Sequence, residues 1–357
     1  MRSSSGTTAP PPPTSPGASG SALASPAAPA IPAAGFDPQC WIGHVLGTYR
    51  ILECIGRGGM GVVYRAEHVL LGRPVAIKIL LPELARRADM VLRMFREART
   101  VNQIGHPNII DVVDFVHRTD DDPPLVYVVM ELLAGQDLCT RVTRSGPLGI
   151  DDALALATQM ADALSAVHRA GLMHRDLKPE NLFLVGQPDG TLRVKILDFS
   201  LAKGFGKRRL LEMTEPGSPV GTPCYMAPEQ ILTRDVDHRS DIYAFGVVLY
   251  YALSGRVPFQ GRSFEELLRK QQQAVPPLSG LDLRVDPLAA AFEALVRRCL
   301  ARDPKDRFQS MDEVLAALGA VRQQEAQVIH RLEPSMIKSR RGDATVYGFS
   351  LHRRVTA

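Results

Sequence analysis

The 357-residue sequence predicts an α+β protein with two lobes, a small antiparallel β-rich lobe followed by a larger, mostly helical lobe. Before residue 133, short runs rich in Val and Ile are bounded by Gly, Pro or Asp, which is typical of β-strands. After residue 133, apolar residues recur at the spacing of amphipathic helices. We therefore expect a cleft between the two lobes.

The β-rich lobe is expected to span residues 49–133, with folding beginning near Tyr49. A single helix, residues 82–103, interrupts its strands, and Gly105 and Pro107 follow this helix as stop signals. The predicted strands are residues 49–55, 61–68, 74–80, 110–117 and 125–131.

The helical lobe is expected to span residues 134–322. Its first helix, residues 151–170, opens with two aspartates and ends before Gly171. The apolar positions of this helix are Leu154, Ala157, Ala161, Leu164 and Val167. Further helices are predicted at residues 239–254, 263–273, 288–300 and 311–331.

Both ends of the chain differ in composition from the two lobes. Residues 1–40 are expected to be a disordered tail, because the first 35 residues contain eight prolines and one charge, Arg2. Residues 323–357 are expected to hold a helix end and a basic tail, which carries the whole net charge of +4. Each tail is either a solvated extension or a segment that binds a partner, and the basic one can also touch anionic lipid.

Composition excludes several classes of function. Outside the basic tail the charges balance, which argues against a nucleic-acid-binding surface. The five cysteines form no C-x-x-C pair, so no disulfide framework or zinc site is predicted and a reducing cytoplasm is the expected location. The longest apolar run, residues 244–253, is half the roughly 20 residues of a membrane-spanning helix, and the first residues lack the apolar core of a secretory signal.

A glycine-rich segment lies between the first two predicted strands. It consists of Gly56, Arg57, Gly58, Gly59, Met60, Gly61, Val62 and Val63. A dinucleotide-binding loop is excluded because a strand rather than a helix follows, and a P-loop is excluded because no Gly-Lys-Ser/Thr follows. The segment is either an ordinary glycine-rich hairpin or one whose backbone N–H groups approach phosphate oxygens.

A lysine stands near the end of the third predicted strand. Lys78 follows three apolar residues, and its ammonium either reaches water or meets an anion. Glu97, in the helix that comes next, can pair with it. Such a strand–helix ion pair would hold Lys78 against nucleotide phosphates.

Three further motifs follow in order along the chain. They are His174-Arg175-Asp176-Leu177-Lys178-Pro179-Glu180-Asn181, Asp198-Phe199-Ser200 and Ala227-Pro228-Glu229. Together with the glycine-rich segment and Lys78, this set resembles the protein kinase superfamily, and more narrowly the bacterial eukaryotic-like serine/threonine kinases. The resemblance covers residues 49–319, about three quarters of the chain, and implies a bilobal protein kinase fold.

The resemblance implies a grip on the phosphates of ATP. Gly56, Gly58 and Gly61 would cover the phosphates. Lys78, held by Glu97, would bind the α- and β-phosphates.

The resemblance also implies the groups that carry out the transfer. Asp198 and Asn181 would hold Mg²⁺, which prefers hard oxygen ligands. Asp176 would accept the proton of the substrate hydroxyl, and Lys178 would lie beside the transferred phosphoryl group.

An adenine site follows from the same resemblance. The ring would lie between the apolar side chains of the two lobes, which are Ile55, Val63 and Ala76 above and Phe183 below. Met130 would be the gatekeeper in front of the hinge. Backbone groups of Glu131 and Leu133 would hydrogen-bond the base.

The substrate class is implied by two positions. Lys178 in the catalytic loop and Thr222 before the Ala-Pro-Glu motif match the serine/threonine form. Two scaffold roles complete the match, since Asp241 would brace the catalytic loop and Glu229 would pair with Arg307.

The segment that follows Asp198 carries a departure from the family and a hypothesis on regulation. Ser200 stands where the family usually has glycine, so we expect altered switching of this segment rather than lost catalysis. Thr214 is the first candidate for phosphorylation and Ser218 the second, with the phosphate pairing with Arg175. Incidental hydroxyl groups in a flexible loop are the alternative.

The leading hypothesis is a cytoplasmic serine/threonine protein kinase of bacterial signalling, dependent on ATP and Mg²⁺ and autophosphorylating. Its partners would be ATP and protein substrates with Ser or Thr. Dimerisation for trans-autophosphorylation is a further hypothesis. The alternative is a pseudokinase scaffold with weak or no turnover, which only Ser200 favours. A small-molecule phosphotransferase on the same fold is disfavoured by the segment around Thr222 and the Ala-Pro-Glu motif.

Overall fold

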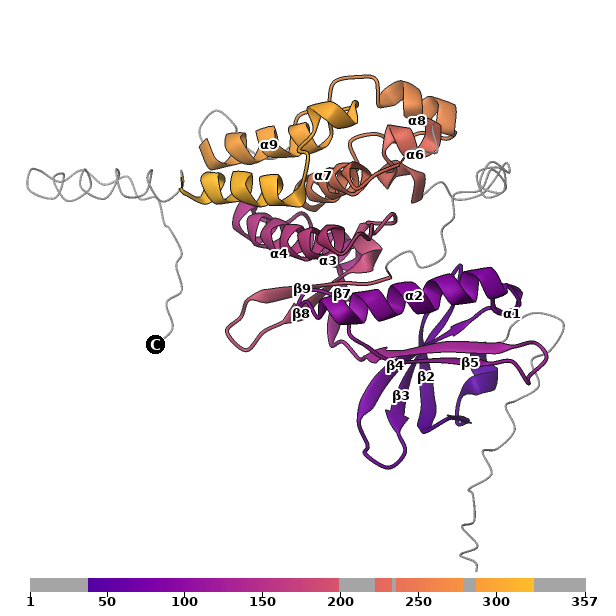
Figure 1. Ribbon diagram of the computed structural model, residues 1–357. Helices are drawn as coiled ribbons and strands as arrows, with labels where there is room; N and C mark the ends of the chain where they lie inside the picture. The colour runs from indigo at the N-terminus through magenta and orange to yellow at the C-terminus, as the bar shows by residue number, and fades with distance from the viewer. Residues whose placement is uncertain (1–37, 199–221, 233–235, 279–286, 324–357) are drawn as a thin grey trace, which may run out of the picture.

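A computed structural model describes residues 38–198, 222–232, 236–278 and 287–323, and it shows two lobes (Figure 1). The smaller lobe is a β-sheet with two helices, and the larger lobe is mostly helical. The two-lobed α+β fold predicted from the sequence is therefore confirmed.

The small lobe contains a six-stranded antiparallel sheet in the order β1-β2-β3-β4-β6-β5. Its strands are β1 (Val45–Leu46), β2 (Tyr49–Gly58), β3 (Gly61–His68), β4 (Pro74–Leu80), β5 (Val112–Arg118) and β6 (Leu125–Glu131). All five predicted strands are present, because alternating β-branched residues between turn residues specify both a strand and its buried face.

The sequence predicts that the small lobe begins near Tyr49, but its fold begins earlier. The 3-10 helix η1 (Pro38–Trp41) and strand β1 precede β2, and Trp41 is fully buried. Trp41 packs with Tyr64, Tyr127 and other apolar residues on one face of the sheet. A four-residue helix and a two-residue strand carry no periodic pattern, so the sequence gives no signal for them.

The predicted helix over residues 82–103 is two helices, α1 (Pro82–Ala85) and α2 (Ala88–Ile104). The chain leaves helical conformation at Arg87, where φ is −94° and ψ is 89°. Met94 of α2 and Val126 of β6 belong to one apolar cluster. This cluster holds α2 against the sheet face opposite to Trp41.

The large lobe combines a small sheet with a helical bundle. Its elements are β7 (Gly135–Asp137), α3 (Leu138–Ser145), α4 (Ile150–Arg169), η2 (Pro179–Asn181), β8 (Leu182–Gly186), β9 (Leu192–Ile196), η3 (Thr222–Tyr225), α6 (Pro228–Leu232), α7 (Arg239–Ser254), α8 (Phe264–Lys270), α9 (Pro287–Cys299), η4 (Pro304–Asp306) and a helix over residues 311–323. The last predicted helix, residues 311–331, extends past the described residues. The strands β7, β8 and β9 form one antiparallel sheet, which the sequence pattern does not predict.

Helices α4 and α7 form the core of the large lobe (Figure 1). Both are buried over most of their circumference, and α7 also packs against α9. Gly246 permits this approach, since a Cβ atom there would lie 2.7 Å from the Cβ of Cys299. Within the described parts of the chain, no helix is long and apolar enough to cross a membrane.

Candidate active site

The sheet of the small lobe presents one face to the site. Val63 lies opposite Lys78 in the β3–β4 pair, and Ala76 lies opposite Met130 in the β4–β6 pair. Directly opposed residues and alternate residues along a strand share a face, so these four side chains lie on one side of the sheet. All four belong to the adenine and phosphate contacts that the sequence predicts from this lobe.

The glycine-rich segment forms the tip of the β2–β3 hairpin, where Gly58 pairs with Gly61. The hairpin predicted from the sequence is present. A side chain at Gly61 would collide with the carbonyl oxygen of Ile79 on the neighbouring strand, which explains a glycine there.

The side chain of Val62, a predicted nucleotide contact, faces away from the site. It is buried in the core on the far face of the sheet, because successive residues of a strand point to opposite faces. Met60 packs beside the cluster under α1 and α2. Ile55 is 48% exposed, so its side chain is available to a ligand. Of Val62, only the backbone remains for phosphate contact.

The hinge is the connection between β6, which ends at Glu131, and β7, which begins at Gly135. Gly135 has φ of 157°, and a Cβ atom there would collide with the carbonyl oxygen of Leu184. The same Cβ position lies 3.2 Å from the Phe183 ring. Phe183 on β8 therefore lies directly against the end of the hinge, on the side of the large lobe.

The catalytic loop precedes β8 and groups three predicted residues. Lys178 Nζ lies 3.3 Å from Asp176 Oδ2. Asn181 Nδ2 donates a hydrogen bond to the carbonyl oxygen of Asp176 at 2.8 Å. The side chains of Asp176 and Lys178 are 12% and 21% exposed, so the pair is largely shielded from water.

The β8–β9 hairpin brings Asp198 to the same place. Its ladder pairs Leu182 with Ile196, and beyond the ladder the N–H of Leu197 donates to the carbonyl oxygen of Asn181 at 2.8 Å. Asn181 thus connects to Asp176 through its side chain and to the residue before Asp198 through its backbone. Residues that lie far apart in the sequence are therefore neighbours in the fold.

Asp241, on α7, braces the catalytic loop. Its carboxylate accepts hydrogen bonds from the backbone N–H groups of His174 and Arg175, each at 2.8 Å, and lies 2.9 Å from His168 Nε2. Burial by itself would raise the pKa of Asp241, but the hydrogen bond and charge of His168, with His174 and Arg175, hold that pKa below its usual range. The carboxylate therefore stays ionised and keeps its acceptor role.

Lys78 does not form the expected ion pair with Glu97. Both residues are described, and Lys78 Nζ instead binds Asp198 Oδ1 at 2.5 Å. Lys78 is 13% exposed at its side chain and Asp198 51%. In this structure, the predicted phosphate-binding cation thus neutralises the predicted metal ligand.

Glu97 is half-buried in this structure, without Lys78 at its carboxylate. Burial raises the pKa of Glu97 to about 7, and the positive charges of Arg175 and Arg93 act in the opposite direction. A half-buried carboxylate without an ion-pair partner among the described residues favours its protonated form near neutral pH. The raised pKa thus accompanies the separation of Glu97 from Lys78, whose Nζ binds Asp198 instead.

The donor set of the site fits a hard divalent cation. Asp198 supplies a carboxylate, and Asn181 keeps its amide oxygen because its Nδ2 is used on Asp176. Mg²⁺ is usually bound by one or two such protein oxygens together with substrate phosphates and water. Among the described residues, no group of three or more His, Cys, Asp or Glu side chains is placed to hold a metal ion without such additional ligands.

The activation segment is only partly described. Ser200, Thr214 and Ser218 lie outside the described residues. Thr222 begins η3, which leads into α6 and the Ala-Pro-Glu motif. The hypotheses on these four positions stay predictions.

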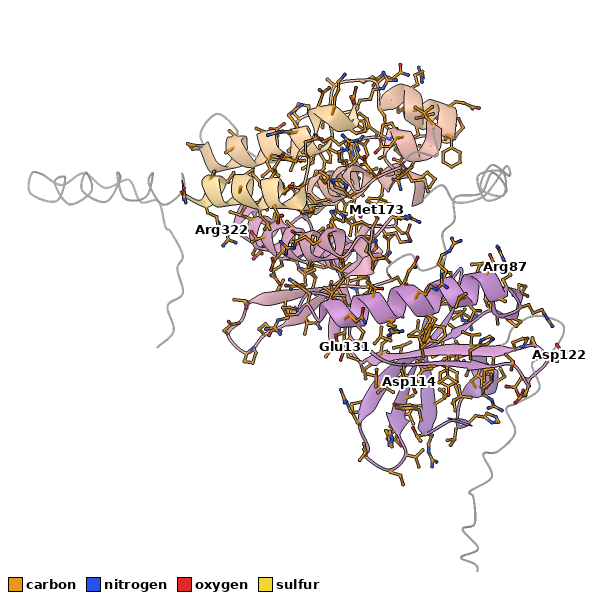
Figure 2. All side chains as sticks on the ribbon, in the orientation of Figure 1. Arg87, Asp114, Asp122, Glu131, Met173 and Arg322 are labelled. Carbon is orange, nitrogen blue, oxygen red and sulfur yellow. The ribbon has the colours of Figure 1, made fainter. Side chains whose placement is uncertain are left out.

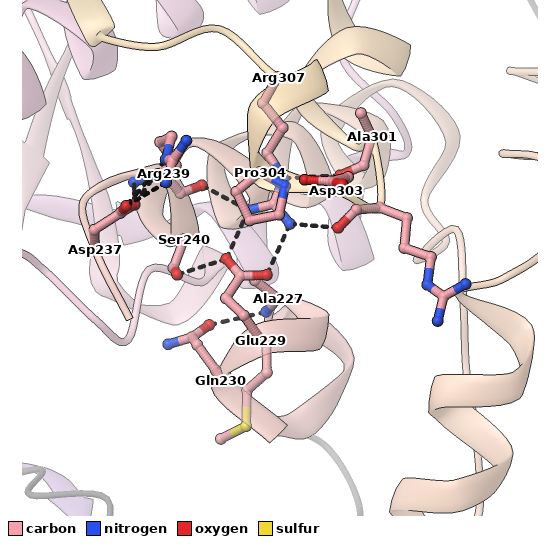
Figure 3. Close-up of polar contacts among 12 residues, drawn as sticks. Ala227, Glu229, Gln230, Asp237, Arg239, Ser240, Ala301, Asp303, Pro304 and Arg307 are labelled. Atoms are coloured by element: carbon pink, nitrogen blue, oxygen red, sulfur yellow. Dashed lines mark hydrogen bonds and ion pairs between the residues drawn. The ribbon is translucent and has the colours of Figure 1, made fainter. Parts of the chain in front are cut away.

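The Ala-Pro-Glu motif is anchored by the predicted Glu229–Arg307 pair (Figure 3). Two guanidinium nitrogens bind the two carboxylate oxygens at 2.7 and 2.8 Å, and Ser240 donates a third hydrogen bond to Glu229. Burial would raise the pKa of Glu229, but the hydrogen bonds and charge of Arg307 hold that pKa below its usual range. Arg307 itself is fully buried, so this pair fixes the end of the activation segment to the large lobe.

A search of protein families matches the family described as the protein kinase domain to residues 49–317. The chain belongs to the protein kinase family. The serine/threonine-protein kinases Pkn1 and pkn2 of Myxococcus xanthus are 41% and 39% identical to this kinase over 76% and 77% of its length. PknE of Mycobacterium bovis is 37% identical over 78%. The kinase covers only 38%, 32% and 47% of these three relatives.

Solved kinase structures share this fold. The kinase domain of Mycobacterium tuberculosis PknI matches with a TM-score of 0.58 and 27% identity, covering 78% of this kinase and 97% of that chain. Rad53 1-466 in complex with AMP-PNP matches with a TM-score of 0.60 and 28% identity, covering 75% of this kinase and 64% of that chain. The family predicted from the motifs is confirmed by these comparisons.

Two residues at the site are absent from the sequence-based set of site residues. His168 contacts Asp241, and Lys195 contacts the hinge residue Glu131. His168 lies at the end of a long amphipathic helix, where histidine is common for other reasons. Lys195 lies between Val194 and Ile196 in a short strand. Because successive residues of a strand point to opposite faces, this alternation is the one sequence signal that Lys195 faces away from the core.

Proposed function

We propose that this kinase transfers the γ-phosphoryl group of ATP to Ser or Thr hydroxyl groups of proteins. Its curated relatives carry the name serine/threonine-protein kinase, and one structural neighbour was solved with AMP-PNP. The general activity would be that of a non-specific serine/threonine protein kinase, with ATP and Mg²⁺ as cofactors. Autophosphorylation, a cytoplasmic location and partner binding by the tails belong to the same proposal.

The main support for this activity is that Asp176, Asn181 and Asp198 lie close together where the catalytic loop meets the β8–β9 hairpin. Asp176 would accept the proton of the attacking hydroxyl. Lys178, 3.3 Å from Asp176, would keep that carboxylate oriented and offer its charge to the transferred group. Bound at Asp198 and Asn181, Mg²⁺ would neutralise negative charge on the phosphates.

In this mechanism Lys78 would leave Asp198 and bind the nucleotide phosphates. Arrival of nucleotide phosphates and a cation would give Lys78 and Asp198 separate partners of opposite charge. Protein kinases depend mainly on such positioning and charge neutralisation, since the chemistry itself needs few groups. A pseudokinase scaffold is disfavoured because Lys78, Asp176, Asn181 and Asp198 are all present.

The test is phosphoryl transfer with labelled ATP and Mg²⁺, comparing the wild-type chain with Asp176→Asn. We expect the wild type to label itself or a general Ser/Thr protein substrate. The variant should lose activity by about 10³-fold, because a general base contributes about 10²–10⁴-fold. Phosphoamino-acid analysis should find phosphoserine or phosphothreonine.

Equal labelling by both proteins would contradict the role of Asp176. Absence of labelling by the wild type, while nucleotide still binds, would favour the pseudokinase scaffold.

A further inference from the structure

A second lysine, Lys195 on β9, lies beside the hinge. Its Nζ donates to Glu131 Oε1 at 2.6 Å and to the carbonyl oxygen of Ile109 at 3.2 Å. The same Glu131 oxygen accepts a hydrogen bond from the N–H of Asp111 at 2.9 Å. The side chains of Lys195 and Glu131 are only 14% and 26% exposed. This is a shielded, charge-assisted contact, the kind that contributes more than an exposed ion pair.

The contact joins three segments that are distant in the sequence. Glu131 is the last residue of β6 and the first of the hinge, at the junction of the two lobes (Figure 2). Ile109 and Asp111 belong to the loop between α2 and β5, and the N–H of Glu131 donates back to the carbonyl oxygen of Asp111 at 3.1 Å. Lys195 belongs to β9, which leads to Asp198.

Backbone pairing holds the loop and β9 in fixed register. Ile109 forms a parallel bridge with Ile196. The N–H of Ile196 donates to the carbonyl oxygen of Asn108 at 2.8 Å, and the N–H of Ile110 donates to the carbonyl oxygen of Ile196 at 3.1 Å. The loop is thereby attached to β9 by its main chain, whereas the hinge is attached to β9 through the Lys195–Glu131 side chains.

We propose that Lys195 and Glu131 are positioning residues that fix the hinge backbone relative to Asp198 and so determine the affinity for ATP. The inference rests on the proposed function, in which the hinge holds the adenine and Asp198 lies at the phosphate end. The two ends of ATP bind to different segments, and the ion pair sets the separation of those segments.

Loss of the lysine removes the only cation that an ion-pair contact places on Glu131 among the described residues. The carboxylate would then lose its shielded partner and turn toward water. Since it belongs to the first hinge residue, its movement would displace the backbone groups of residues 131–133. Methionine at position 195 fills a similar volume without the charge, so packing changes little.

The experiment measures kcat and the KM for ATP of Lys195→Met, Glu131→Gln and the double variant, with calorimetric binding of Mg²⁺–ADP as a second readout. We expect each single variant to raise the KM for ATP and the Kd for ADP about tenfold, with kcat within about twofold of wild type. The KM and Kd of the double variant should not exceed those of the more impaired single variant, because both substitutions remove the same contact. Lys195→Arg keeps a cation and should stay within about threefold of wild type.

A matched control removes a lysine–glutamate pair remote from the hinge. Lys270 lies 2.9 Å from Glu266 on α8, and Lys270→Met should leave both the KM and the Kd unchanged.

Three results would overturn the proposal. They are an unchanged KM and Kd in Lys195→Met, a loss confined to kcat or melting temperature, and additive effects in the double variant. If the wild type binds ADP but transfers no phosphoryl group, the proposed function fails, and the calorimetric comparison still decides the role of the pair.

Discussion

Two residues of the site have a backbone conformation that non-glycine residues rarely adopt. Arg175 has φ of 63° and Asp198 has φ of 44°. Such conformations cost about 1–3 kcal/mol each and persist only where surrounding contacts fix them. For Arg175 the fixing contact is the hydrogen bond from its N–H to the buried Asp241. The conformation of the catalytic loop therefore depends on the buried carboxylate of Asp241.

Glu97 carries a prediction on pH dependence. Its pKa is about 7 in the folded chain against 4.5 in the unfolded reference, mainly because burial disfavours its charge. Between these two values the folded state binds the extra proton, so stability from this group is present below pH 4.5 and lost as pH rises to about 7. Glu97→Gln removes that loss. From pH 5 to pH 8 the wild type should lose about 1 kcal/mol relative to the variant, a value discounted for partial exposure.

Urea unfolding at both pH values measures this difference in the free energy of unfolding. The exposed Glu83 provides a control, since Glu83→Gln should preserve the wild-type dependence on pH. Parallel pH profiles for wild type and Glu97→Gln would show that burial of Glu97 has no such effect.

At the scale of elements, the two faces of the small-lobe sheet differ in function, since one faces the site and the other packs in an apolar core. One face carries Val63, Ala76, Lys78 and Met130 toward the site. The other face is closed by η1 and β1, with Trp41 in the centre of an apolar cluster. Because each strand contributes alternate residues to both faces, packing on the closed face fixes the direction of the side chains on the open face.

Trp41→Ala tests this contribution of the segment before Tyr49. We expect a loss of about 3–5 kcal/mol in stability, because the substitution leaves a large cavity in the sheet core. Trp41 Nε1 has no hydrogen-bond partner among the described residues, so Trp41→Phe removes little polar bonding and should cost less. Chemical denaturation of both variants measures the difference. A midpoint for Trp41→Ala equal to that of wild type would show that folding begins at β2.

At the scale of the whole molecule, the sequence predicts the two lobes, the five long strands and the main helices. It does not predict β7, β8 and β9, because strands of three to five residues between turns contain too few positions to show alternation. It also does not show the break at Arg87, where no proline or glycine interrupts the helical pattern. Tertiary packing decides these features.

The candidate site divides in the same way. Motifs in fixed order identify Asp176, Asn181 and Asp198, and the β8–β9 ladder brings them together. The partner of Lys78 is not determined by the sequence, because Glu97 and Asp198 both offer a carboxylate. Which of them binds is decided by how the tertiary structure places α2 and Asp198 relative to β4, and local sequence does not encode that placement.

A crystal structure of this kinase with Mg²⁺ and a non-hydrolysable ATP analogue tests directly whether Asp176, Asn181 and Asp198 meet around the terminal phosphate. We predict a cation held by Asp198 and Asn181 oxygens at about 2.1 Å. Lys78 should leave Asp198 for the phosphates, and the terminal phosphate should face Asp176. A nucleotide bound elsewhere, or a terminal phosphate remote from Asp176 with Lys78 still on Asp198, would contradict the account.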